Sequence, residues 1–297
     1  MTRTLQTVAP GIRALTAPNP GPMTFQGTRT YILGVSDCAV VDPGPEDGGH
    51  LAAVLGALGQ GTLRYILVTH AHRDHSAGVA ALKAATGAEV LAFGPASAGR
   101  SPMMQAIAER GDLAGGEGID AEFRPDRELV HGERIDTREW LLEALHTPGH
   151  LSSHMCFACP HAGVVFTGDT LMGWSTPVIS PPDGSIGAFL GSMALLRERS
   201  ESLYLPGHGN PVTEGPKAAR AQALHRKIRE SQILAALEQG PATVPALTEQ
   251  IYTGLAEALR PAARRNVLAH LLDLVEQGRF ALPDGPLTEA EYTLAAD

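Results

Sequence analysis

The sequence has few cysteines, few aromatic side chains and no long apolar run. The 297 residues include three cysteines, and this small, odd number does not fit a disulfide framework. Such low cysteine content is expected for a protein of a reducing compartment. No apolar run approaches the ~18 residues of a membrane-spanning helix. Residues 1–20 also lack the apolar stretch of a signal peptide. We therefore expect a cytoplasmic protein that does not insert into a membrane.

The remaining composition is typical of a folded globular protein. Hydrophobic residues make up 43% of the chain, charged residues 19%, and the net charge is −9. This balance argues against intrinsic disorder. The length fits one large domain, or a large domain followed by a small one. Aromatic residues, at 5% of the chain, provide few rings for stacking on nucleic-acid bases.

Residues 1–215 alternate short apolar strands with helices that are rich in alanine and leucine. The expected strands are Tyr31–Val35, Cys38–Val41, Tyr65–Val68, Glu89–Ala92, His154–Ala158 and Gly163–Thr167. The expected helices are Leu51–Leu58, Ala77–Ala85 and Ile186–Arg197. Because several strands are wholly apolar, we expect an α/β domain whose sheet is buried under helices. The polar stretch 101–138 has no clear period and is expected to be a surface excursion.

Residues 216–297 have a different pattern, in which three helices precede a hairpin. The helices are expected over Lys217–Glu238, Pro245–Tyr252 and Pro261–Gln277. The segment Phe280–Leu287, with Asp284-Gly285 near its centre, has strand–turn–strand character. This order predicts a second, small helical domain of winged-helix outline.

Basic side chains are concentrated in the helices of this second region. Lys227, Arg264 and Arg265 are candidates for contacts with the phosphates of a nucleic acid. A solvated helix face has the same composition, so both interpretations stay open.

Histidine occurs 12 times and is distributed unevenly along the chain. The run Thr69-His70-Ala71-His72-Arg73-Asp74-His75 directly follows an apolar strand and precedes a helical stretch. Neutral imidazoles and carboxylates are ligands of zinc and of other borderline divalent ions. A single histidine in such a loop would more often be structural, but three histidines with an aspartate indicate a metal site.

Three further candidate ligands each follow another apolar run. His150 ends the segment Thr147-Pro-Gly-His150, Asp169 follows Phe166-Thr-Gly, and His208 follows Leu205-Pro-Gly. The glycine before each candidate permits a sharp turn and a close approach of the backbone. Together the seven side chains suffice for two metal ions.

This set of motifs resembles the metallo-β-lactamase superfamily, whose fold is a four-layer αβ/βα sandwich. The resemblance lies in His70-x-His72-x-Asp74-His75, followed in order by His150, Asp169 and His208, with Asp42 of Val41-Asp42-Pro43-Gly44 as a further motif. Segments 19–30, 176–183 and 259–271 also resemble the β-lactamase-like protein 2 subgroup. That subgroup carries a C-terminal winged-helix domain.

The resemblance implies a set of ligands for each of two divalent ions. His70, His72 and His150 would hold the first ion, and Asp74, His75 and His208 the second, with Asp169 bridging the two. Zinc is the expected metal, and Mn²⁺ and Fe²⁺ also suit this mixture of ligands. Asp42 would orient the ligand loop from behind.

The chemistry implied is hydrolysis by a hydroxide that bridges the two metal ions. Asp74 would orient that hydroxide besides binding metal, and Asp169 would act through its bridging position. His154 would face the cleft and donate a proton to the leaving group. The alternative for His154 is a histidine that is hydrogen-bonded beside the site.

Three functions remain open for this site. The basic helices, together with the single-stranded RNA endonucleases of the resembled subgroup, favour cleavage of RNA phosphodiesters. The alternative is a glyoxalase II-like hydrolase of a thioester or another small ester or lactone. The third is a nucleic-acid-binding protein with a catalytically idle metal domain. The C-terminal module can also wall off the cleft or mediate contact between two copies of the chain in a homodimer.

Overall fold

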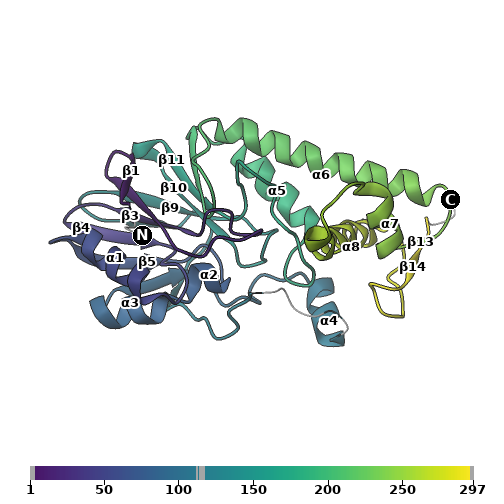
Figure 1. Cartoon of the computed structure of the whole chain (residues 1–297), viewed down its shortest axis with the longest axis horizontal. Helices are drawn as coiled ribbons and strands as arrows, with labels where there is room; N and C mark the ends of the chain where they lie inside the picture. The colour runs from purple at the N-terminus through teal and green to yellow at the C-terminus, as the bar shows by residue number, and fades with distance from the viewer. Residues whose placement is uncertain (1–3, 112, 114–117, 295–297) are drawn as a thin grey trace.

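The computed structural model describes residues 4–111, 113 and 118–294, which form two main β-sheets flanked by helices (Figure 1). In spatial order the seven strands of the first sheet are β1 (Gln6–Ala9), β2 (Ile12–Thr16), β3 (Arg29–Leu33), β4 (Asp37–Val41), β5 (Thr62–Leu67), β6 (Glu89–Ala92) and β7 (Arg127–Glu128). The five strands of the second sheet are β12 (Leu203–Pro206), β11 (Val164–Gly168), β10 (Met155–Cys159), β9 (Leu141–His146) and β8 (Arg134–Asp136). Strands β4 to β7 are parallel, as are β11 and β12.

The two sheets share an apolar core. Tyr31 and Leu67 of the first sheet and Phe157 and Phe166 of the second belong to it, and all four side chains are buried. The rings of Tyr31 and Phe166 meet edge to face, with their centroids 5.3 Å apart. Such aromatic contacts fix the spacing between the sheets.

Helices cover the outer face of each sheet, because the strands carry apolar side chains on both faces. Helices α1 (Gly48–Leu58) and α3 (Val79–Thr86) pack on the first sheet. Helix α5 (Ile186–Leu196) and the first half of α6 (Gly215–Leu237) pack on the second. The predicted four-layer αβ/βα sandwich is thereby confirmed. The short helix α2 (Arg73–Ser76) and the 3₁₀ turn η1 (Pro160–Ala162) lie in connections.

The C-terminal module is built around the far half of α6, which runs out of the sandwich into it (Figure 1). Its other helices are α7 (Val244–Ile251) and α8 (Arg260–Glu276), preceded by the 3₁₀ turn η2 (Glu257–Leu259). Ile233 and Leu237 of α6 pack with side chains of α7 and α8 in one apolar core. Because α6 belongs to both units, the domain boundary at 215/216 stays a prediction.

Two expectations about local structure are wrong. The excursion at 101–138 contains a helix, α4 (Pro102–Arg110), whose Met104 and Ile107 are buried in the core of the C-terminal module. The segment Phe280–Leu287 does not form a hairpin; instead β13 (Ala242–Thr243) pairs with the distant β14 (Glu291–Tyr292). In both cases a long-range contact with the module core decides the local structure.

No helix within residues 4–111, 113 and 118–294 combines the length and the apolar character needed to cross a membrane.

Candidate metal centre

The candidate ligands lie at the ends of four strands. The run His70–His75 follows β5, His150 follows β9, Asp169 follows β11 and His208 follows β12. Strands β9, β11 and β12 point in the same direction within the second sheet, so their carboxyl ends share one edge. The loops at this edge bring together side chains that are far apart in the sequence.

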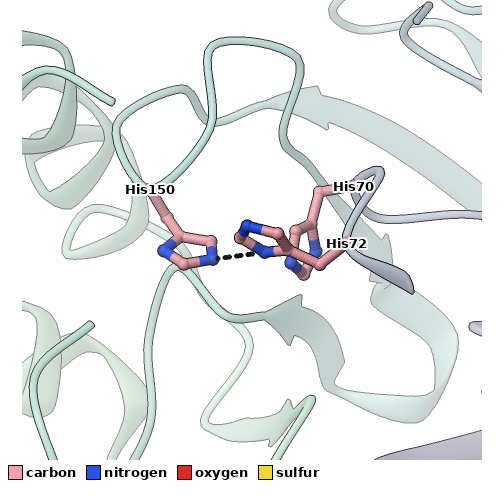
Figure 2. A group of neighbouring side chains, drawn as sticks. All are labelled: His70, His72 and His150. Carbon is pink, nitrogen blue, oxygen red and sulfur yellow. Dashed lines mark hydrogen bonds between the residues drawn. The ribbon is translucent and has the colours of Figure 1, made fainter. Parts of the chain in front are cut away.

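One group of ligand atoms comes from His70, His72 and His150, whose ring nitrogens lie within 4.8 Å of one another. Figure 2 shows the imidazoles of His72 and His150 facing each other from two separate loops, with Nδ1 of His72 3.0 Å from Nε2 of His150. Three convergent imidazoles are a donor set that zinc and related ions accept.

A second group consists of Asp74, His75 and His208, again within 4.8 Å. Oδ2 of Asp74 lies 3.3 Å from Nε2 of both His75 and His208. Asp169 lies between the two groups, with its carboxylate 3.3 Å from His208 and 3.8 Å from His150. The seven predicted side chains therefore converge, whereas their assignment as metal ligands stays a prediction.

The histidines are oriented by the ring nitrogen that faces away from the centre. Nδ1 of His150 donates to the Val178 carbonyl at 2.7 Å, and Nδ1 of His75 lies 2.9 Å from Oδ2 of Asp42. Nδ1 of His70 lies 2.9 Å from the Thr69 hydroxyl, which itself donates to Asp42. The opposite nitrogen, Nε2, is thus left with its lone pair toward the centre, as metal-binding histidines require.

Asp42 occupies the position expected of an orienting carboxylate behind the ligand loop. It is buried, and it accepts from the backbone N–H and the hydroxyl of Thr69 besides facing His75. Its φ of 53° lies in the left-handed region. A non-glycine residue held there by several hydrogen bonds is typical of a functional site.

His154 lies elsewhere than expected for a proton donor. Its side chain is fully buried, and its Nε2 accepts from the backbone N–H of Asp169 at 3.2 Å. Its Nδ1 lies 3.0 Å from the hydroxyls of both Thr147 and Thr170. Both ring nitrogens therefore have hydrogen-bond partners within the protein, which favours the interpretation of a histidine hydrogen-bonded beside the site, and its catalytic role stays a prediction.

Two glycines permit the close packing around Asp169. A Cβ atom at Gly207 would lie 2.4 Å from Oδ1 of Asp169, and one at Gly168 would lie 2.6 Å from Nε2 of His154. A larger residue at Gly207 would displace the Asp169 carboxylate, and one at Gly168 would displace the His154 ring.

The donor set fits divalent cations. Nε2 of His70 and Oδ1 of Asp169 are buried and have no hydrogen-bond partner among the described residues, and such unpaired buried groups are costly. Burial lowers the pKa of His72 to about 3. For His208, burial acts in the same direction but the carboxylates of Asp169 and Asp74 outweigh it, so that the pKa rises to about 9. The buried carboxylates thus raise the proton affinity of a neighbouring imidazole, which means that the site stabilises positive charge, as a bound cation would require.

A cavity of about 520 Å³ opens onto these side chains. His72, Asp74, His150, Asp169 and His208 form its polar end. The opposite wall comes from the C-terminal module and is mainly apolar: it includes Tyr252, Leu255, Ala258, Leu259, Pro261, Ala262 and Ala263. This volume is within the usual range for small-molecule sites, about 300–1,000 Å³.

The three basic candidates differ in their relation to this cavity. Arg265 contributes to the wall, whereas Lys227 and Arg264 are exposed on α6 and α8 and do not line the cavity. Among the described lining residues, Arg265 is the only lysine or arginine. The expected nucleic-acid contacts through Lys227 and Arg264 stay a prediction.

Sequence reasoning missed Thr28, whose hydroxyl donates to Oδ2 of Asp74 at 2.8 Å. It lies next to the backbone of His208, with which it forms an isolated β-bridge. Its place in the segment 19–30, which resembles the β-lactamase-like protein 2 subgroup, was the available signal, but nothing local connects Thr28 with a residue 46 positions away.

Two family matches cover both parts of the chain. Residues 23–208 match the family described as metallo-beta-lactamase superfamily, and residues 243–281 match the beta-lactamase associated winged helix domain.

Among curated proteins, a beta-lactamase-like protein 2 homolog of Drosophila melanogaster is 30% identical over 273 residues, which is 88% of this chain and 87% of that protein. An atrochrysone carboxyl ACP thioesterase of Passalora fulva is 27% identical over 91% of this chain and 76% of its own length. A solved metallo-beta-lactamase family protein of Thermus thermophilus superposes with a TM-score of 0.76 at 25% identity, covering 97% of this chain and all of that one.

Proposed function

The chain belongs to the metallo-beta-lactamase superfamily, and we propose that this hydrolase acts on a thioester or a related small ester with the help of two divalent metal ions. The observation that supports this substrate class is the mainly apolar cavity of about 520 Å³ that leads to the histidine cluster. The similarity to β-lactamase-like protein 2 and the associated winged helix, expected from the motifs, is confirmed.

The ligand assignment follows the two clusters. His70, His72 and His150 would hold one ion and Asp74, His75 and His208 the other, with Asp169 shared. Bound divalent ions supply Lewis acidity, which lowers the pKa of water and stabilises the negative charge that develops during hydrolysis. Zinc is the metal we propose, and Mn²⁺ and Fe²⁺ suit the same donors.

The residues of the chain contribute orientation and exclusion of water. Asp74 faces the cavity with a quarter of its side chain exposed, and the Thr28 hydroxyl holds Oδ2 of its carboxylate. In this position Asp74 can accept a hydrogen bond from a water molecule and orient it for attack on the substrate. The apolar wall of the C-terminal module would cover the acyl group and keep bulk water away from the reacting carbonyl.

A thioester is favoured over RNA by the character of the cavity wall. A nucleotide chain needs several cations for its phosphates and aromatic faces for its bases, and Arg265 is the single lysine or arginine among the described lining residues. The relative from Passalora fulva is named a thioesterase and is similar over 91% of this chain.

Cleavage of single-stranded RNA is the second candidate. It is supported by the match of residues 243–281 to a winged helix and by Arg265, which lines the cavity.

The test compares a simple acyl thioester, such as an S-acyl N-acetylcysteamine, with a single-stranded RNA oligonucleotide. Each is assayed with the zinc-loaded protein and again after a chelator. We expect chelator-sensitive release of thiol and much slower cleavage of RNA. Chelator-sensitive cleavage of RNA without thioester turnover would overturn the choice of substrate. Failure to turn over either substrate, with two metal ions bound, would favour the idle-domain alternative.

A further inference from the structure

The connection between β11 and α5 contains the backbone group that orients His150. Residues 170–185 include no helix or strand, so their position depends on contacts with the rest of the protein. The carbonyl of Val178 accepts the Nδ1 proton of His150 at 2.7 Å. Any shift of this carbonyl would rotate the imidazole whose Nε2 faces His72.

The residues on both sides of Val178 are held by the C-terminal module. The Pro177 carbonyl accepts from Nη2 of Arg226, which lies on α6. The Ile179 N–H donates to Oδ1 of Asn266, which lies on α8, at 3.1 Å. Nη1 of Arg226 donates to the same amide oxygen at 3.0 Å. Asn266 therefore holds the peptide group that contains the Val178 carbonyl, and Arg226 holds the peptide group before it.

A second side chain of α6 holds the beginning of the same connection. Nε2 of Gln222 donates to the Met172 carbonyl at 2.7 Å and to the Ser175 carbonyl at 3.3 Å. Gln222 and Arg226 are four residues apart and therefore on the same face of the helix. The connection is thus attached to helix α6 at Met172, Ser175 and Pro177.

Arg226 is an unfavourable residue for a purely structural contact. Only 1% of it is exposed, and burial lowers its pKa to about 10. Within the described part of the chain no carboxylate pairs with it, and its remaining contact is with the Phe189 ring, 5.3 Å from the guanidinium carbon. An apolar side chain would join helix and core at lower cost, because a buried charge without a counter-ion is strongly penalised. What the guanidinium adds is a planar fork that places two acceptors at fixed positions.

We propose that Arg226 and Asn266 are positioning residues for the metal centre, acting through the Val178 carbonyl on His150. The inference rests on the proposed function, in that His150 is taken as a metal ligand. It makes the C-terminal module part of the metal-binding apparatus besides being a wall of the cavity. Partners that orient a ligand from behind typically change metal affinity about 10- to 100-fold when they are removed.

The test measures metal affinity rather than turnover. Metal-free full-length protein is titrated with zinc in competition with a chromophoric chelator, which gives the number of ions bound and the Kd of each. The variants are Arg226→Met, Asn266→Ala and the conservative Arg226→Lys. The control is Arg220→Met, which removes an exposed arginine from the same helix. Thermal unfolding identifies any variant that fails to fold.

We expect the wild type and Arg220→Met to bind two ions equally well. In Arg226→Met and in Asn266→Ala one ion should bind about tenfold more weakly, with the other Kd unchanged. Arg226→Lys should recover part of the loss, since an ammonium group can reach one of the two acceptors. In a His150→Ala background, Arg226→Met should have no additional effect on either Kd.

Two results would overturn different claims. If the wild type binds two ions and the folded variants bind both with unchanged Kd, the positioning role is wrong while the proposed function stands. If the wild type binds no stoichiometric metal, the proposed function itself fails. Should Arg226→Met not fold, Asn266→Ala decides the question, because it removes the anchor of Ile179 and leaves the guanidinium in place.

Discussion

Single hydrogen bonds decide which ring nitrogen of His70, His75 and His150 faces the other candidate ligands. Asp42 shows this most clearly, because its Oδ2 lies 2.9 Å from Nδ1 of His75 and its carboxylate also accepts twice from Thr69. A carboxylate in this place only accepts, so His75 must carry its proton on Nδ1. Nε2 of His75 thereby faces Asp74 and His208, where its lone pair would be available to a metal ion.

Replacing Asp42 by asparagine should therefore weaken metal binding without changing the shape of the site. An amide directs an N–H group at Nδ1 of His75 or at Thr69, and so favours the wrong tautomer. We expect the affinity of the ion beside His75 to fall about 10- to 100-fold, measured by zinc titration of the metal-free protein. The control is Asp37→Asn. Asp37 lies at the start of β4, the strand that ends just before Asp42, and its replacement removes a surface ion pair with Arg64. Equal zinc affinities for the two variants would contradict the role of Asp42.

Trp174 is the largest side chain at the rim of the cavity. It lines the cavity that opens onto the candidate ligands and also a neighbouring groove of about 500 Å³. It stacks on Phe25, with ring centroids 5.0 Å apart, and a Cβ at Gly209 would lie 2.7 Å from its Cδ1. The ring is thus held in place although 36% of it is exposed, which suits a wall that binds substrate.

Trp174→Ala should raise the KM for an acyl thioester and leave kcat nearly unchanged. Loss of an aromatic contact of about 1.5–3 kcal/mol corresponds to roughly a 10- to 100-fold increase. Trp174→Phe should keep most of the affinity. Steady-state kinetics with the two variants test this, and a fall in kcat at constant KM would show that Trp174 acts on the reaction rather than on binding.

The contact between helices α5 and α8 contains a buried carboxyl group. Asp273 of α8 is 4% exposed and faces Gly187 of α5, where a Cβ would lie 2.6 Å from its Oδ1. Burial, followed by the negative charge of Glu230, raises the pKa of Asp273 from 3.8 to about 6. The folded protein therefore holds this proton more tightly than the unfolded chain does, and the contact loses stability as the pH rises through that interval.

Asp273→Asn should stabilise the protein at neutral pH and have little effect in acid. The amide still accepts from the Gly187 N–H and carries no charge. Allowing for partial solvation, we expect a gain of about 1–2 kcal/mol in the free energy of unfolding near pH 7.5, vanishing near pH 4. Urea unfolding at both values, with chelator present throughout, measures the difference. A gain of the same size at both pH values would rule out titration of Asp273 as its cause.

Helices and strands with a clear local pattern of apolar residues could be predicted from the sequence. Elements whose structure depends on contacts with distant parts of the chain could not. The strands before His70 and Asp169 overlap the apolar runs Tyr65–Val68 and Gly163–Thr167, for which strands were expected. Helix α4 has only Met104 and Ile107 as buried residues, and these pack against a module more than a hundred positions away. The pairing of β13 with β14 likewise joins segments that are far apart in the sequence, Ala242 with Tyr292. Turn residues at 284–285 predicted a hairpin, but Phe280 and Leu287 are instead buried in the module core.

The same distinction applies to the site. Seven candidate ligands were identified because histidine and aspartate recur directly after apolar runs, in an order that resembles the metallo-β-lactamase superfamily. The Thr28 hydroxyl on Asp74, the Val178 carbonyl on His150 and the apolar wall at Leu255 depend on how the loops and the C-terminal module are packed. Sequence patterns therefore predicted the chemistry of the centre better than they predicted what surrounds it.

At the scale of the whole molecule, the catalytic sandwich and the C-terminal module share one cavity. The sandwich supplies the polar end, and η2 with the start of α8 supplies much of the apolar wall. Substrate size should then be controlled by the module and the hydrolytic chemistry by the sandwich. A substitution in the apolar wall can therefore change substrate size selection without changing the hydrolytic chemistry, provided that the hydrogen bond from His150 to the Val178 carbonyl is kept.

Ala262→Phe makes that separation testable, because Ala262 lines the cavity from the first turn of α8. The added ring would occupy part of the space for an acyl chain, while the Ala262 carbonyl could still accept from Asn266. We expect kcat/KM for a long-chain acyl thioester to fall at least about tenfold, since overpacking a full site costs about 1–3 kcal/mol. Turnover of an acetyl thioester and zinc affinity should stay within about twofold of wild type. Ala235→Phe, on the exposed face of α6, is the matched control. Equal losses for the two thioesters would mean that the module does not select substrate size, because a wall that excludes only long chains cannot slow the hydrolysis of acetyl groups.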